Sequence, residues 1–508
     1  MTRVVSIGLD GAAWHKLDLM MTEGQLPNLQ KLSERGARAP LRTVHPPVTC
    51  PAWRCSTSGK NPGKLGVFWW LDLDRKTGSM STPDARSFNT ADVWDYLSDE
   101  GERCAVVNVP MTYPPTQVNG KMVSGFGAPF DLDEGDISIT YPSEFDSELR
   151  EQYDWKMGID DITAPEGRQA AYDVIQSRFE LLLDLLEEDY DYLHLTVFYI
   201  NMLQHKYSDG EETTKGWKII DNYLGELLNE DAILLLYSDH GHSTIERTVA
   251  INRWLMEQGY LSLESNASDQ ATQSLYSLLT KVGISPKRLA RFLRNTLPKS
   301  VYERLISSAS LIPVSELSER IDWAESDAVA LSQGPLYINR DRLGSDYNAF
   351  RNSLKEELSS LSYRGEPVLS DVYTSSEVYE GPYLDAGPDL MLVSSQGWEI
   401  YGGIVPSTFE AQASSWTSGN HPIGVLLCSG PGIIDDELPE QSILDVAPTI
   451  LYALGCSIPE DMDGEPLLEL FENERGINKR EPIKRLDKQN RNLNDKLSER
   501  LEDLGYLE

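Results

Sequence analysis

Short apolar runs alternate with longer amphipathic stretches along most of this chain, and this alternation limits its fold more than any other feature. The apolar runs have the length of strands and lie at residues 3–9, 104–110, 192–199, 232–239, 389–395 and 423–430. The stretches with helical spacing lie at 26–36, 89–101, 168–189, 215–230 and 442–455. Strands that are apolar throughout are buried on both faces, and their alternation with helices favours a parallel sheet. The sequence therefore predicts an α/β fold, with a mostly parallel central sheet and helices on both faces.

One segment interrupts this alternation. Residues 262–325 are polar and helical in pattern, and they contain a basic stretch, 286–300, in an otherwise acidic chain. We expect 262–325 to form a helical insertion or cap on a catalytic core made of 1–261 and 326–470. Residues 471–508 alternate in charge, and we expect a charged C-terminal tail, either a surface helix or a loosely held arm.

The net charge excludes one class of partner. The chain has 80 acidic and 45 basic residues, which gives a formal net charge of −35. Binding to a nucleic-acid polymer needs a basic face, so we expect none. An acidic excess of this size suits a protein that stays soluble in high salt, where charges are screened within about 3 Å at 1 M. We therefore expect a halophilic source, with an acidic protein of ordinary salt as the alternative.

Cysteine usage and hydropathy bear on the compartment. The five cysteines are scattered, odd in number and without a CxxC pair, so they indicate no disulfide framework. No apolar run reaches the roughly 18 residues of a membrane span. The first residues favour a buried strand over a signal peptide. We expect a cytoplasmic protein without a transmembrane segment, and the sequence leaves its oligomeric state open.

Side chains that bind divalent cations stand next to several of the expected strands. These residues are Asp10, Asn201, His205, Asp239, His240 and His421. Each alone is explained as well by a turn or a solvated side chain. Together they place carboxylate oxygens and imidazole nitrogens at strand ends, where open α/β sheets bind ligands. Such a mixed donor set suits zinc or a similar divalent ion.

Thr49 stands in a stiff frame, HPPVTCPAW, between prolines. The prolines fix a turn, and a helix that starts near Pro51 would direct its positive N-terminus toward a bound anion. Two cations about 3.5–4 Å apart can clamp a phosphoryl group and activate a hydroxyl as a nucleophile. Thr49 is therefore a candidate nucleophile, and a plain helix cap is the alternative.

The ordered motifs resemble the type I phosphodiesterase/nucleotide pyrophosphatase family of the alkaline phosphatase superfamily. They read GLDG, PPVTCPAW…SGKNPGKLGVF, NMLQH, SDHGH and SGNHPIGVLLCSGPGI, and the closing LEDLGYLE is similar to the ends of many such proteins. The resemblance covers about 1–255 and 325–470. It implies an alkaline-phosphatase-like three-layer sandwich, a site for two divalent metal ions, usually zinc, and a covalent intermediate on Thr or Ser.

Carried over residue by residue, the resemblance implies two ligand sets. The first metal would be held by Asp10, Thr49, Asp239 and His240, with Thr49 also the nucleophile, and the second by Asn201, His205 and His421. The family usually has Asp at position 201. The neutral amide of Asn201 binds a cation more weakly and removes one negative charge. We expect zinc, with manganese or iron as alternatives.

Two further positions bear on the substrate. Nucleotide-cleaving members carry a phosphate-binding Asn twenty-one residues after the nucleophile, and here that spacing reaches Trp70. We therefore assign no nucleotide specificity, and Trp70 is a candidate substrate-binding residue with core packing as its alternative. Sulfatase relatives use Cys-x-Pro-x-Arg, whereas this chain has Thr49 and Trp53 at the outer positions, which disfavours a sulfatase mechanism.

The resulting hypothesis is a metal-dependent phosphoesterase that forms a phospho-threonine intermediate on Thr49. The resemblance favours a phosphodiester over a monoester, on a phosphorylated small molecule, glycan or lipid. Two alternatives stay open. One is a phosphoryl or head-group transferase or mutase of the same superfamily. The other, which Asn201 motivates, is a non-catalytic binder of phosphorylated glycan or lipid.

Overall fold

The computed structural model describes residues 3–128, 138–159, 161–264, 312–483, 501–502 and 504–507. The basic stretch 286–300 and most of the predicted insertion at 262–325 lie outside these ranges. Its described end forms the helix α14 (Val314–Arg320) and the short 3-10 helix η1 (Trp323–Glu325).

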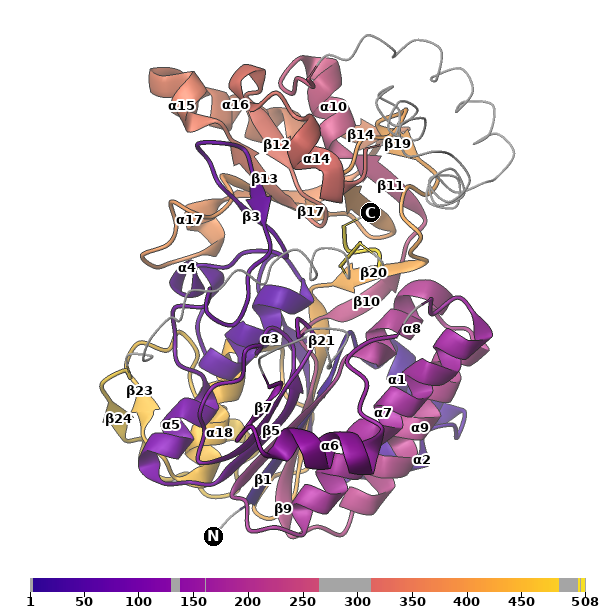
Figure 1. Ribbon diagram of the computed structural model, residues 1–508, viewed down its shortest axis with the longest axis vertical. Coiled ribbons are helices and arrows are strands. Elements are labelled where there is room, and N and C mark those ends of the chain that lie inside the picture. The colour runs from indigo at the N-terminus through magenta and orange to yellow at the C-terminus, as the bar shows by residue number, and fades with distance from the viewer. Residues whose placement is uncertain are drawn as a thin grey trace.

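Among the described residues, nine strands form a central sheet in the order β22-β2-β21-β9-β1-β8-β5-β6-β7 (Figure 1). Their bounds are β1 (Arg3–Leu9), β2 (Gly36–Arg42), β5 (Cys104–Val109), β6 (Gly120–Ser124), β7 (Thr140–Tyr141), β8 (Tyr192–Val197), β9 (Ala232–Tyr237), β21 (Ile423–Ser429) and β22 (Gln441–Ser442). The pairs β1–β8, β1–β9, β5–β8 and β5–β6 are parallel, whereas β21 is antiparallel to β9 and to β2. The predicted mostly parallel sheet is confirmed.

Helices cover both faces of this sheet, as the apolar strands predict (Figure 1). One face packs against α2 (Pro27–Ser33), α7 (Pro165–Leu186), α8 (Tyr199–Tyr207) and α9 (Glu211–Leu227), and the other against α3 (Thr49–Ser58), α5 (Val93–Glu100) and α18 (Val446–Leu454). Successive residues of a strand point to opposite faces. In β1, Val5 and Ile7 accordingly join the first core and Val4 joins the second. The three layers follow from this alternation.

A second group of elements lies beyond the sheet, at the top of Figure 1. A four-stranded antiparallel sheet is made of β12 (Ala328–Ala330), β13 (Pro335–Ile338), β17 (Leu390–Ser394) and β16 (Leu369–Thr374), and a three-stranded sheet of β18 (Trp398–Tyr401), β11 (Arg247–Ala250) and β19 (Phe409–Glu410). The apolar run at 389–395 thus forms β17, which pairs with β16 in this smaller sheet and not with a strand of the central sheet. Between the two groups, β10 (Gly241–Thr244) pairs with β20 (Ser418–His421).

The remaining described elements are short or peripheral. The helices are α1 (Trp14–Thr22), α4 (Pro62–Leu65), α6 (Phe145–Tyr153), α10 (Ile251–Gln258), α15 (Arg340–Leu343), α16 (Tyr347–Ser359) and α17 (Ser375–Val378). Small two-stranded ladders are β3 (Asp72–Leu73) with β4 (Met80–Ser81), β14 (Ser362–Tyr363) with β15 (Glu366–Pro367), and β23 (Ile458–Pro459) with β24 (Lys479–Arg480). Within the described ranges, no helix combines the length and apolar character that crossing a bilayer requires. All five cysteines are free and buried.

Candidate active site

The residues predicted for the site gather at the edge of the central sheet where its parallel strands end. Asp10 follows β1, and Asp239 and His240 follow β9. Asn201 and His205 lie in α8, directly after β8. Because β1 is paired with both β8 and β9, these three strand ends are neighbours.

Thr49 and His421 reach the same edge by another route. The strand β21 runs antiparallel to β9, so it begins where β9 ends, and His421 comes just before it. The strand β2 is in turn antiparallel to β21, with Arg42 opposite Ile423, so β2 also ends at this edge. Thr49 follows as the first residue of α3, and it is fully buried.

Asp10, Asp239 and His240 form the tightest cluster. One ligand atom from each lies within 4.8 Å of the others. His240 Nε2 is 3.2 Å from Asp239 Oδ2 and 3.8 Å from Asp10 Oδ1. The Thr49 hydroxyl oxygen lies 3.2 Å from the same ring nitrogen. The structure therefore brings together all four residues that were predicted around the first metal.

The other polar atoms of this cluster have fixed partners. The Trp53 indole N–H donates to Asp10 Oδ2 at 2.9 Å, and the Gly11 N–H donates to Asp239 Oδ1 at 3.2 Å. His240 Nδ1 lies 2.8 Å from the Gly241 carbonyl oxygen. A carbonyl oxygen only accepts, so Nδ1 carries the hydrogen and Nε2 has a lone pair. Asp10 Oδ1 and Asp239 Oδ2 find no hydrogen-bond partner among the described residues.

The electrostatics of this cluster favour a cation. Burial raises the pKa of Asp10 well above its ordinary value, and the charge of Asp239 raises it further. Burial also raises the pKa of Asp239 to about 7 and lowers that of His240 to about 4. Two carboxylate oxygens and an imidazole lone pair thus face one another in a dry pocket and repel. The orphaned oxygens, the imidazole nitrogen and the Thr49 hydroxyl together fit a divalent cation such as zinc.

The second set of donors is assembled only in part. His205 Nδ1 donates to the Ser418 carbonyl oxygen at 2.8 Å, so Nε2 has a free lone pair, and this buried atom has no partner in the described chain. Asn201 is also fully buried, and its amide nitrogen has no described partner. His421 is half-buried, and its Nδ1 accepts from the Ile423 N–H at 3.1 Å. His205 and Asn201 are therefore buried at the centre, each with a polar atom left unpaired by the described residues, whereas the half-buried His421 lies at its margin.

Gly11 allows Asn201 to approach the loop after β1. A Cβ atom at this position would lie 2.2 Å from Asn201 Oδ1, and the backbone has a φ of +68°. Both conditions require glycine. His242 donates from Nδ1 to the Gly11 carbonyl oxygen at 2.7 Å and so anchors the same loop.

The site contains one residue that the sequence analysis did not single out. Tyr506 is buried, and its ring lies 4.8 Å from Trp70, 5.0 Å from Trp416 and 5.9 Å from His205. Burial and the charge of Asp10 raise the pKa of its hydroxyl, whereas Thr49 lies close enough to oppose this rise. Trp70, the candidate substrate-binding residue, is fully buried in the main hydrophobic core, and its ring contacts that of Tyr506.

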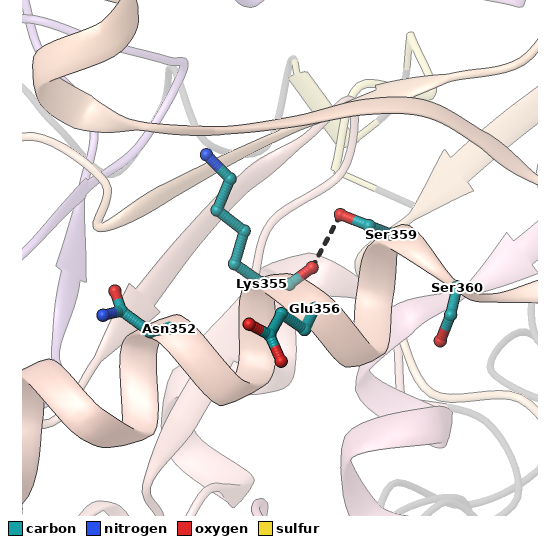
Figure 2. Close-up of a pocket in the computed structure, with 5 residues that line it drawn as sticks. All are labelled: Asn352, Lys355, Glu356, Ser359 and Ser360. Carbon is teal, nitrogen blue, oxygen red and sulfur yellow. Dashed lines mark hydrogen bonds between the residues drawn. The ribbon is translucent and has the colours of Figure 1, made fainter.

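A surface hollow of about 530 Å³ runs along α16, away from these residues (Figure 2). It is lined by Asn352, Lys355, Glu356, Ser359 and Ser360. Lys355 is paired with Glu377 at 2.6 Å, and the Ser359 hydroxyl donates to the Lys355 carbonyl oxygen at 2.7 Å. Lys355 and Ser359 thus already have partners within the protein, and the buried cluster at the sheet edge is the better candidate for chemistry.

The model of the type I phosphodiesterase / nucleotide pyrophosphatase family matches residues 4–423 of the chain. No curated protein sequence matches it. Among solved structures, phosphonoacetate hydrolase from Sinorhizobium meliloti 1021, in complex with phosphonoacetate, has a TM-score of 0.57 at 16% identity and covers 89% of this chain and 95% of its own.

Human ectonucleotide pyrophosphatase / phosphodiesterase 5 has a TM-score of 0.51 at 12% identity, with 90% of this chain and 95% of that chain covered. An inactive form of the murine protein, in complex with AMP, has a TM-score of 0.50 at 11% identity, with coverages of 90% and 96%. At such identities the likeness concerns the fold, and it confirms the alkaline-phosphatase-like sandwich that the sequence predicts.

Proposed function

Because the chain belongs to the type I phosphodiesterase / nucleotide pyrophosphatase family, we propose that it is a phosphoester hydrolase that cleaves a phosphodiester with Thr49 as its nucleophile. The observation that carries this proposal is the position of the Thr49 hydroxyl. It lies 3.2 Å from His240 Nε2 at the start of α3, beside the orphaned oxygens of Asp10 and Asp239. The first backbone N–H groups of a helix attract an anion to that place.

The metal requirement is part of the proposal. Asp10, Thr49, Asp239 and His240 would hold one divalent cation, and Asn201, His205 and His421 would hold another. We propose zinc, with manganese or iron as alternatives. When bound, such ions stabilise the charge of the phosphoryl group and make a hydroxyl more acidic. Buried lone pairs without partners on Asp10, Asp239 and His205 support this assignment.

The chain's own residues account for the covalent steps. Thr49 Oγ forms a bond to phosphorus while the ester P–O bond breaks, and the released alcohol takes up the threonine proton. The N-terminal N–H groups of α3 stabilise the negative oxygens during this transfer. Water then attacks phosphorus, breaks the phospho-threonine bond and restores the hydroxyl. The net reaction is hydrolysis of one ester bond.

Substrate and setting complete the proposal. The substrate is a phosphorylated small molecule, glycan or lipid, and the burial of Thr49 requires its phosphate to enter the protein. A net charge of −35 and five free cysteines support work in the cytoplasm of a halophile. A second candidate is a non-catalytic binder of the same compounds, which the neutral amide at Asn201 favours.

The test is hydrolysis of bis-p-nitrophenyl phosphate in high salt by protein loaded with zinc, manganese or iron. Thr49→Ala should abolish turnover, and Thr49→Ser should retain part of it. Thr22→Ala, at an exposed threonine of α1, is the matched control and should behave as the unsubstituted protein. Mass spectrometry of acid-quenched reactions should find phosphate on the peptide that contains Thr49. Alcohol acceptors added to the assay would reveal a transferase by its new ester product.

Asn201→Asp tests whether the protein is a non-catalytic binder. Restoring a carboxylate at this position should raise the metal content and the rate, whereas Asn201→Ala should lower the metal content. If the unsubstituted protein hydrolyses nothing with any of the three metals, and Asn201→Asp gains activity, the protein is a binder. Turnover that survives Thr49→Ala would remove the threonine from the mechanism.

A further inference from the structure

The last described residues of the chain pack into the protein beside the candidate site. Leu501, Leu504 and Leu507 belong to the main hydrophobic core. The Leu504 carbonyl oxygen accepts from the Trp416 indole N–H at 3.2 Å, and the Leu507 carbonyl oxygen accepts from the Ser315 N–H at 3.1 Å. In Figure 1 this yellow segment lies beside β20, between the central sheet and the upper elements. Part of the expected charged tail is thus an internal element.

This packing gives Tyr506 a fixed position. Its ring is held edge-on by Trp416 at 5.0 Å and lies against Trp70 at 4.8 Å. Trp416 itself stacks on the ring of His205 at 3.7 Å, nearly parallel. The aromatic side chains therefore connect the tyrosine directly to a residue that would hold the second cation.

The hydroxyl of Tyr506 lies beside the reacting centre and has no hydrogen-bond partner in the described part of the chain. It lies close to the side chains of Thr49 and Asn201. Yet among the described residues no atom makes a well-formed hydrogen bond with it, although Tyr506 is only 2% exposed. A buried hydroxyl without a partner is costly. Its orientation is explained if the hydroxyl hydrogen-bonds to an oxygen of a ligand that also contacts Thr49.

We propose that Tyr506 is a catalytic residue whose hydroxyl donates a hydrogen bond to an oxygen of the phosphoryl group that Thr49 attacks. This inference rests on the proposed function and adds a residue to that site. A neutral O–H donor can stabilise the negative charge that develops on such an oxygen without adding a cation of its own. The hydroxyl needs no deprotonation for this role.

A blocking role fits the same contacts less well. A segment that only plugs the site would be satisfied by the groups it covers, whereas the Tyr506 hydroxyl is not. A plug must also leave before catalysis. Three buried leucines and two hydrogen bonds to backbone carbonyl oxygens hold this segment in place, so its release would expose core side chains. A fixed donor is consistent with both observations.

The experiment compares Tyr506→Phe with the unsubstituted full chain, both loaded with the same metal. The substitution removes one oxygen and keeps the ring that packs on Trp70 and Trp416. On bis-p-nitrophenyl phosphate we expect kcat to fall by about 10²-fold, as for loss of one oxyanion donor, with KM little changed. Binding of orthovanadate, followed by calorimetry, should weaken more than binding of inorganic phosphate.

Tyr96→Phe is the matched control. Tyr96 is a fully buried tyrosine of α5 whose hydroxyl also lacks a described partner, and α5 packs on the opposite face of the sheet from α8. It should leave kcat and vanadate affinity unchanged. Equal melting temperatures and metal contents of the two variants would show that the effect of Tyr506→Phe is chemical and not structural.

Three results separate the possibilities. Unchanged kcat and vanadate affinity in Tyr506→Phe would overturn this inference and leave the proposed function intact. A rise in kcat would overturn it in favour of a blocking segment. If the unsubstituted protein has no turnover, the proposed function fails, and vanadate and phosphate binding still decide the role of Tyr506. Equal binding by the two proteins, or no binding by either, then counts against it.

Discussion

At the scale of single residues, the main feature is a pair of buried carboxyls for which protons and a metal cation compete. Burial raises the pKa of Asp239 to about 7 and raises that of Asp10 well above its usual range. Each carboxyl holds its proton below its raised pKa, and only the ionised form is a metal ligand. His240, with its pKa lowered to about 4 by burial, is neutral near pH 7, so its Nε2 can bind a cation without displacing a proton.

We therefore expect the affinity for zinc to fall as the pH falls from about 8 to about 6, by about tenfold per pH unit for each proton displaced. The measurement is the zinc dissociation constant by competition with a chelator at constant high salt. Asp239→Asn cannot titrate at this position, so its affinity should be lower and depend less on pH. An affinity that stays constant over this range would show that these carboxyls are already ionised in the metal-free protein.

At the scale of elements, the segment that contains residues 504–507 tests how the site is held together. Leu507 is fully buried there, whereas Leu19 on α1 is 55% exposed. Leu507→Ala should lower the free energy of unfolding by about 2–5 kcal/mol, because it leaves a cavity in the core. Leu19→Ala should change it by less than about 0.5 kcal/mol.

Chemical unfolding at a fixed salt concentration measures both variants. We also expect Leu507→Ala to reduce phosphoesterase activity, because the segment that carries Tyr506 would pack less tightly. Equal stabilities for the two leucine variants would indicate that this segment does not contribute to the folded core in solution.

The elements also show what local sequence can and cannot predict. The apolar runs at 3–9, 192–199 and 232–239 identify β1, β8 and β9, so the positions of Asp10 and Asp239 at strand ends follow directly. The run at 423–430 is equally clear, but its apolar pattern does not encode that β21 is antiparallel. His421 reaches the site only because β21 runs in that direction. Its place in the predicted site came from the family resemblance and not from the apolar pattern.

Tyr506 could not be predicted in this way. Leucines at 501, 504 and 507 have a three-residue spacing, which is a weak sign of a buried face among alternating charges. The aromatic partners Trp70 and Trp416 are far away in sequence, so the burial of this segment depends on tertiary packing alone. Asn201 shows the opposite case, because the sequence alone predicts that its neutral amide weakens metal binding. Its full burial in α8, by contrast, depends on tertiary packing.

At the scale of the whole molecule, the excess of acidic residues should make the melting temperature depend on salt. With a net charge of −35, the acidic side chains repel one another and destabilise the folded state. Salt weakens this repulsion, because the screening length falls from about 10 Å at 0.1 M to about 3 Å at 1 M. We expect the melting temperature to rise over this range of sodium chloride. Sulfate is unsuitable for this test, because it strengthens apolar burial by itself. A melting temperature that stays flat or falls would contradict a halophilic origin.

The order of strands has a consequence for biosynthesis. The strand β2 comes early in the chain, yet in the sheet it lies between β21 and β22 and pairs with no other described strand. While a ribosome is still making the middle of the polypeptide, β2 has no partner strand. The helix α3, which follows β2 and begins at Thr49, is then not yet held in position. Such distant pairing is slow to form. The nascent chain therefore has no assembled nucleophile until residues beyond 423 have emerged.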